Sequence, residues 1–130
     1  MRKQPVIHVL VCFFVLLVTS AASAQPYERV TEKRVAPVKG KKLVVKGAVY
    51  DGDEVVYKFK ARPGQRLDIN LIGRDADFSF SVIYELDVNT IAQDTTSWSG
   101  RLPSGFTGNC EIAVHSNYKL ADYRLEILLK

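Results

Sequence analysis

The feature that most constrains this chain is a two-residue alternation of apolar and polar side chains through residues 55–130. The last such segment is the clearest, with Tyr123, Leu125, Ile127 and Leu129 interleaved with mostly charged neighbours. A period of two places alternate side chains on opposite faces of a β-strand, whereas an α-helix repeats every 3.6 residues. No segment shows a convincing apolar repeat at helical spacing, so the pattern predicts an all-β protein.

The alternation, together with weaker apolar segments, predicts seven or eight short strands. The candidate segments are residues 43–50, 55–61, 67–72, 78–84, 88–92, 95–102, 110–115 and 123–130. Turn-forming sequences rich in Gly, Pro and Asp separate them at residues 51–53, 62–64, 73–75 and 103–105. Strands with one apolar and one polar face pack as two sheets, so we expect an antiparallel, jelly-roll-like β-sandwich over residues 41–130.

The amino-terminal segment has the three parts of an export signal. A basic start, Met1-Arg2-Lys3, precedes an apolar run over residues 6–18, and Ala22-Ser23-Ala24 supplies the small residues that a signal peptidase requires. The run is shorter than the roughly 20 apolar residues needed to span a bilayer. We therefore expect residues 1–24 to be a signal peptide cleaved before Gln25. This predicts a periplasmic or secreted protein that does not span the membrane after cleavage.

Residues 25–40 are expected to form a basic arm. Seven basic residues and two acidic residues lie between Glu28 and Lys46. Pro26 and Pro37 disfavour a continuous helix, so this segment is interpreted as a flexible tether or an edge segment. Its charge suits either solvent exposure or contact with anionic envelope polymers. Nucleic acid is not expected as a partner, because export is predicted and the remaining chain is richer in acidic residues.

The residues left after signal cleavage offer little catalytic chemistry. His8 and Cys12 fall within the signal, which leaves His115 and Cys110. These two are five positions apart, so a continuous strand places them on opposite faces and prevents a Cys-His dyad. No G-x-S-x-G motif occurs, and one His with a buried Cys does not supply the usual zinc ligands. We predict no catalytic residues, no metal site and no cofactor, and hence no enzyme.

Acidic clusters and the single tryptophan leave alternatives open. The acidic residues Asp51, Asp53 and Glu54, and the pair Asp75 and Asp77, lie at predicted turns, where Asp serves to form the bend. Calcium binding by these oxygen ligands is the functional alternative, although the spacing does not match an EF-hand. Trp98 is either a ligand platform or a core residue, and its alternation with Gly100 and Leu102 favours the core.

Three framework motifs resemble a known superfamily. They are Tyr57-x-Phe59-x-Ala61-x-x-Gly64-Gln65-x-Leu67-x-Ile69-x-Leu71, Trp98-x-Gly100-x-Leu102-Pro103 and Ala121-x-Tyr123-x-Leu125-x-Ile127. Together they resemble the prepeptidase carboxy-terminal-like β-sandwich superfamily and, within it, the periplasmic inhibitors of goose-type (g-type) lysozyme. The likeness extends over residues 46–129. It implies a sandwich fold and a non-catalytic binding function, with a lysozyme as the protein partner.

The resemblance also indicates where binding would occur. In the inhibitor family, loops at one edge of the sandwich enter the lysozyme cleft and present polar or basic side chains to a catalytic carboxyl group. The matching positions form two loops, at residues 50–53 and 115–119, whose candidate partner-binding residues are Tyr50, Asp51, His115, Asn117, Tyr118 and Lys119. Tyr118 would be the packing anchor and Lys119 the donor, although the second loop lacks the family's arginine. The alternative is an accessory module that binds peptidoglycan or another envelope polysaccharide.

Overall fold

The computed structural model describes residues 29–130 of the chain, so the predicted signal peptide lies outside the described residues. Within them the chain forms nine strands and no helix. The strands are β1 (Arg29–Arg34), β2 (Leu43–Tyr50), β3 (Asp53–Lys60), β4 (Arg66–Ile72), β5 (Ala76–Ile83), β6 (Val88–Thr95), β7 (Ser97–Arg101), β8 (Asn109–Ser116) and β9 (Leu120–Leu129). Residues 29–130 contain no helix with the length and apolar character needed to cross a membrane.

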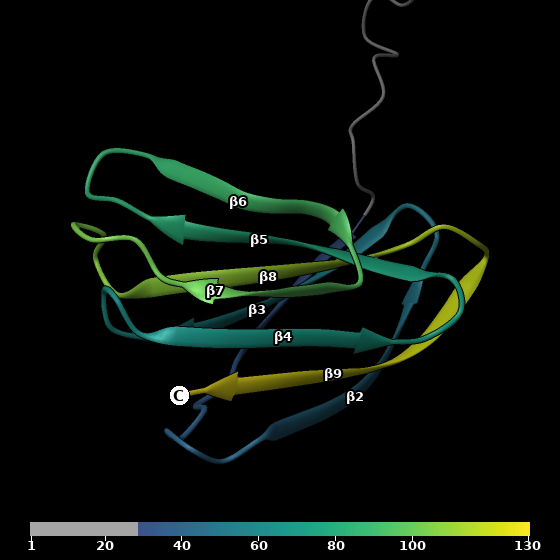
Figure 1. Ribbon diagram of the computed structural model, residues 1–130. Coiled ribbons are helices and arrows are strands. Elements are labelled where there is room, and N and C mark those ends of the chain that lie inside the picture. The colour runs from purple at the N-terminus through teal and green to yellow at the C-terminus, as the bar shows by residue number, and fades with distance from the viewer. Residues whose placement is uncertain (1–28) are drawn as a thin grey trace, which may run out of the picture.

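The strands form two sheets that pack face to face. One sheet has the order β1-β3-β8-β5-β6 and the other β2-β9-β4-β7. Figure 1 shows these sheets as two layers, with β5 and β8 above β4 and β9. Every pairing is antiparallel except that between β1 and β3, which is parallel. The predicted all-β sandwich is confirmed, with nine strands in place of the seven or eight expected.

The additional strand, β1, lies within the segment expected to be a basic arm. Of the two alternatives for residues 25–40, the described part from Arg29 to Arg34 takes the edge position, paired with β3. The sequence of β1 contains one apolar residue, Val30, so it has no apolar alternation by which a strand could be recognised. All six of its side chains are exposed. Lys58 Nζ lies 2.9 Å from Glu32 Oε2 and links β1 to its neighbour across the outer face. The carboxylate of Glu32 raises the pKa of Lys58 and keeps this side chain charged.

The apolar alternation places one face of most strands in the core. The largest side chains with almost no exposed surface are Tyr57, Phe78, Phe80, Leu67, Ile69, Ile112, Leu125 and Ile127. Trp98 is partly buried against this core, with its ring centroid 5.1 Å from that of Phe80. The core interpretation of Trp98 is therefore confirmed. Apolar area removed from water by such residues is the main source of stability for a sandwich of this size.

A hydrogen bond between two buried tyrosines connects the sheets. The hydroxyl oxygens of Tyr57 on β3 and Tyr123 on β9 lie 2.6 Å apart, and their rings meet edge to face. Burial raises the pKa of both phenols, which keeps both hydroxyls neutral. Gly47 on β2 leaves space for this pair, because a Cβ there would lie 2.5 Å from the Tyr123 hydroxyl oxygen. The bond thus needs a tyrosine in each sheet and a glycine beside them.

Strand directions divide the turns between two ends of the sandwich. The turns at residues 51–52, 73–75 and 117–119 lie at one end, since Tyr50 pairs with Leu120, Glu54 with His115, and Ala76 with Ser116. We call this the loop end. The segments at residues 61–65 and 102–108 lie at the other end, where the backbone of Gly64 donates to the carbonyl of Leu102.

The tyrosine pair predicts non-additive mutational effects. Tyr57→Phe or Tyr123→Phe leaves one buried hydroxyl without its partner, and each should lower the free energy of unfolding by about 1–3 kcal/mol. The double variant removes both polar groups and should be more stable than the sum of the single losses implies. Urea unfolding of all four proteins measures this coupling. Strictly additive losses would show that the hydroxyls do not stabilise one another.

Because Cys110 is buried in the core, we predict that its thiol is unreactive in the folded protein. Cys110 is 1% exposed, and burial raises its pKa to about 12, so the reactive thiolate is scarce at neutral pH. Iodoacetamide at pH 8, followed by peptide mapping, should leave Cys110 unmodified in the folded protein and modify it in guanidinium chloride. Modification of Cys110 at similar rates in both states would contradict the described core.

Candidate binding end of the sandwich

The two loops nominated by the sequence lie side by side at the loop end. The backbone N–H of Asp51 donates to the carbonyl oxygen of Lys119 at 3.1 Å, directly joining one loop to the other. The last residue of β2, Tyr50, lies opposite the first residue of β9, Leu120. The β2–β9 ladder therefore brings together two segments that are about 70 positions apart in the sequence.

A third turn supports the second loop from the opposite side. The N–H of Asn117 donates to the carbonyl of Asp75 at 2.7 Å, and its side-chain amide donates to Asp77 Oδ2 at 3.1 Å. Ser116 Oγ accepts a hydrogen bond from the N–H of Tyr118 at 3.1 Å, which forms an ST-turn. Asn117 thus acts as a brace, and the backbone that carries Tyr118 and Lys119 is fixed at both ends.

The loop end presents apolar surface of the kind used for protein recognition. Tyr50 and Tyr118 are 58% and 59% exposed, and Leu120 beside them is also exposed. Tyrosine supplies a large contact area at a small cost in side-chain entropy, and aromatic residues often carry most of the affinity of an interface. Lys119, between Tyr118 and Leu120, is exposed and adds a positive charge. These side chains form a mixed aromatic and basic surface on a braced backbone.

His115 lies in a strand, as the alternation over residues 110–115 predicts, and not in the exposed loop for which the resemblance nominated it. It belongs to β8 and not to the exposed loop, and only 14% of its side chain is exposed. Its Nδ1 atom lies 3.3 Å from Glu54 Oε2, on the neighbouring strand β3. The exposed loop therefore begins after His115, and Lys119 is its one basic side chain. The contact with Glu54 could not be predicted, because the sequence does not show which strand lies next to β8.

The acidic residues of the loop end divide into two groups. Asp51 lies in the turn between β2 and β3, as the turn-forming interpretation predicts, whereas Asp53 and Glu54 begin β3 and Asp77 lies in β5. Among the described residues, a cluster with metal-ligating geometry occurs at Asp77, Asp94 and His115. Asp94 was not among the sequence candidates, because it lies in a weakly patterned segment 17 positions after Asp77. Its juxtaposition with the other two depends on strand order, for which the sequence carries no direct signal.

Basic residues gather at the opposite end. An open groove of about 610 Å³ is lined there by four basic side chains, Lys39, Lys60, Arg62 and Lys130. Lys130 Nζ also lies 2.8 Å from Asp68 Oδ2, and its hydrogen bond to that carboxylate lowers the pKa of Asp68. This basic groove lies at the end opposite the loop end, where the acidic residues Asp51, Asp77 and Asp94 lie.

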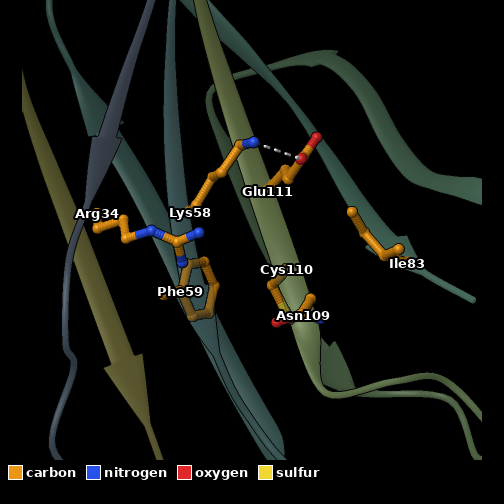
Figure 2. Close-up of a pocket in the computed structure, with 7 residues that line it drawn as sticks. All are labelled: Arg34, Lys58, Phe59, Ile83, Asn109, Cys110 and Glu111. Atoms are coloured by element: carbon orange, nitrogen blue, oxygen red, sulfur yellow. Dashed lines mark ion pairs between the residues drawn. The ribbon is translucent and has the colours of Figure 1, made fainter.

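A smaller pocket beside β1 contains one ion pair but no activated nucleophile. It has a volume of about 190 Å³, and Arg34, Lys58, Cys110 and Glu111 are among its lining residues. Figure 2 shows Lys58 reaching across to Glu111, an ion pair with a separation of 3.7 Å. Burial raises the pKa of the Cys110 thiol, which disfavours the thiolate that nucleophilic attack requires. The side chains that line this pocket come from β1, β3, β5 and β8, and the Lys58–Glu111 ion pair connects β3 to β8.

Comparison with known proteins finds similarity in structure alone. No protein-family model and no curated protein sequence matches the chain. PliG of Aeromonas hydrophila, a periplasmic inhibitor of g-type lysozyme, superposes with a TM-score of 0.65 at 19% identity. The match covers 78% of this chain and 98% of that protein. PliG of Salmonella Typhimurium gives 0.59 at 20% identity and covers 77% of this chain and 98% of that protein.

Another structural neighbour is a domain of an enzyme. The pre-peptidase C-terminal domain of a Bacillus anthracis collagenase superposes with a TM-score of 0.51 at 19% identity, covering 83% of this chain and 100% of the domain. Both branches of the resemblance drawn from the framework motifs therefore recur among the structural neighbours. The chain has the β-sandwich fold shared by PliG lysozyme inhibitors and pre-peptidase C-terminal domains.

Proposed function

We propose that this protein is an exported, non-catalytic inhibitor of a lysozyme, of the g-type class, and that its loop end enters the cleft of the enzyme. The observation that carries the proposal is the hydrogen bond from Asp51 to Lys119, which joins the two nominated loops at one end of a PliG-like sandwich. The PliG neighbours are described as periplasmic inhibitors of g-type lysozyme, which supports both the partner and a periplasmic location. Cleavage of residues 1–24 would deliver the protein there or outside the cell.

The side chains of the loop end take distinct roles in this proposal. Tyr118 is the packing anchor, Tyr50 extends the aromatic surface, and Lys119 donates to a carboxylate in the cleft. Asp51 and Asn117 hold the loops in position through the bonds described above. His115 lies below this surface and supports the start of the loop from β8. A few aromatic and basic side chains of this kind are sufficient for tight recognition when their backbone is already ordered.

A second candidate function is binding of an anionic envelope polysaccharide. The basic groove formed by Lys39, Lys60, Arg62 and Lys130 favours it, because these charges suit phosphate or carboxylate groups on a glycan. This groove is at the end opposite the loops, so the two functions would use separate surfaces. Sedimentation with purified peptidoglycan distinguishes them: Lys60→Ala should reduce glycan binding and leave lysozyme inhibition unchanged.

The inhibitor proposal predicts a specific loss of inhibition. Tyr118→Ala and Lys119→Ala should each raise the concentration needed to inhibit g-type lysozyme by roughly tenfold or more, since interface anchors commonly contribute 1.4 kcal/mol or more. Clearing of a peptidoglycan suspension measures lysis, and circular dichroism confirms that each variant is folded. Lys39→Ala, at the opposite end, is the matched control and should inhibit like the unaltered protein.

Two outcomes would contradict this account. If an excess of the unaltered protein does not slow lysis by g-type, chicken-type or invertebrate-type lysozyme, the protein is not a lysozyme inhibitor. If it inhibits and the two loop variants inhibit equally well, the binding surface lies elsewhere on the sandwich.

A further inference from the structure

Three metal-ligating side chains converge on the outer face of the five-stranded sheet, near the loop end. Asp77 comes from β5, Asp94 from β6 and His115 from β8, and one ligand atom of each lies within 4.8 Å of the others. We propose that these three side chains form a zinc site, with water completing the coordination. This proposal does not depend on the lysozyme partner, because it concerns the outer face of the sheet and not the exposed loops.

Strand order and a local irregularity explain why these residues meet. Asp77 and His115 are direct cross-strand partners in the β5–β8 ladder. The β5–β6 pairing shifts register between Phe78 and Phe80, as at a β-bulge. Asp94 lies in this irregular stretch with φ of 51°, and its N–H donates to Ser79 Oγ at 3.3 Å. A bulge redirects a side chain relative to a regular strand, and here Asp94 lies beside the other two ligands.

The ligand atoms, one imidazole nitrogen and two carboxylate oxygens, indicate which metal ion the site would bind. Zinc is commonly held by three protein ligands drawn from His, Asp and Glu, with a fourth position left for water. Tetrahedral bonds of about 2 Å place ligand atoms roughly 3.3 Å apart, and small side-chain rotations bring atoms that now lie within 4.8 Å of one another to that distance. Calcium prefers six to eight oxygen ligands and gains nothing from an imidazole. One nitrogen with two carboxylates therefore favours zinc over calcium.

The residues around the cluster supply the support that a metal site requires. Glu54 Oε2 lies 3.3 Å from His115 Nδ1, and both side chains are largely buried. A carboxylate beside one imidazole nitrogen orients the ring and directs the other nitrogen to the metal, so His115 would bind through Nε2. On the second ligand, Asn117 donates to Asp77 Oδ2 at 3.1 Å and leaves Oδ1 for the ion. Asn117 thus holds Asp77 in position, and Glu54 lies beside His115.

A zinc ion would also stabilise this end of the sandwich. It would tie together β5, β6 and β8, and Asn117 connects Asp77 to the loop that carries Tyr118. A ligand that binds only the folded state raises the unfolding temperature as its concentration rises above the dissociation constant. Zinc should therefore raise the melting temperature of the protein by several degrees at saturation.

The test measures zinc binding directly. The untagged chain, stripped with a chelator, is titrated with zinc chloride by isothermal calorimetry, and its melting temperature is recorded with and without zinc. We expect one zinc ion per chain and a dissociation constant in the micromolar range. Asp94→Asn and His115→Gln should each weaken binding at least tenfold and abolish the shift in melting temperature. Asn tolerates positive φ, so the first variant keeps the local backbone.

A matched control distinguishes zinc binding at the cluster from nonspecific binding to other acidic residues. Asp122→Asn removes an exposed acidic residue outside the cluster and should bind zinc like the unaltered protein. Melting temperatures without zinc verify that each variant is folded. The proposal is overturned if zinc does not bind, or if Asp94→Asn and His115→Gln bind zinc as strongly as the unaltered chain. Calcium binding of equal strength that survives His115→Gln would also overturn it, in favour of a carboxylate-only site.

Discussion

The hydrogen bond between Tyr57 and Tyr123 fixes how the two sheets are aligned. Burying a hydroxyl without a partner is costly, so the sheets are most stable in the alignment that brings the two oxygen atoms 2.6 Å apart. Gly47 makes that alignment possible by leaving the space that the Tyr123 ring occupies. Both strands concerned, β3 and β9, border the turns of the loop end. The position of the proposed binding surface therefore depends on an interaction inside the core.

In this arrangement, the residues that stabilise the fold are different from those proposed to contact a partner. The core is formed by the inner faces of the strands, whereas Tyr50, Tyr118 and Lys119 extend beyond it from a backbone braced by Asp51 and Asn117. Loops held in this way lose little conformational entropy when a partner binds. A sandwich with short, braced loops is therefore suited to binding, and the same framework can serve an inhibitor or an enzyme-attached module.

Much of the fold could be predicted from the alternation of apolar residues, and the exceptions have physical causes. The burial of Cys110 and the core packing of Trp98 follow from a period of two. Strand β1 could not be recognised, because its sequence has one apolar residue and no alternation, and it is held at the sheet edge by pairing with β3 and by the ion pair between Glu32 and Lys58. The meeting of Asp77, Asp94 and His115 was also unpredictable, since it requires the order β8-β5-β6 and an irregular register. The sequence-based exclusion of a zinc site considered only His115 and Cys110, and the structure brings two carboxylates to the histidine.

The central claim is that the joined loops at one end of the sandwich form the surface that contacts a lysozyme. Amide hydrogen exchange, measured with and without saturating g-type lysozyme, tests it most directly because it maps the contact without altering a residue. The account predicts slower exchange in the complex at residues 50–53 and 116–120, and unchanged exchange at residues 61–65 and 102–108. Protection confined to the opposite end, or no protection at saturating enzyme, would contradict it.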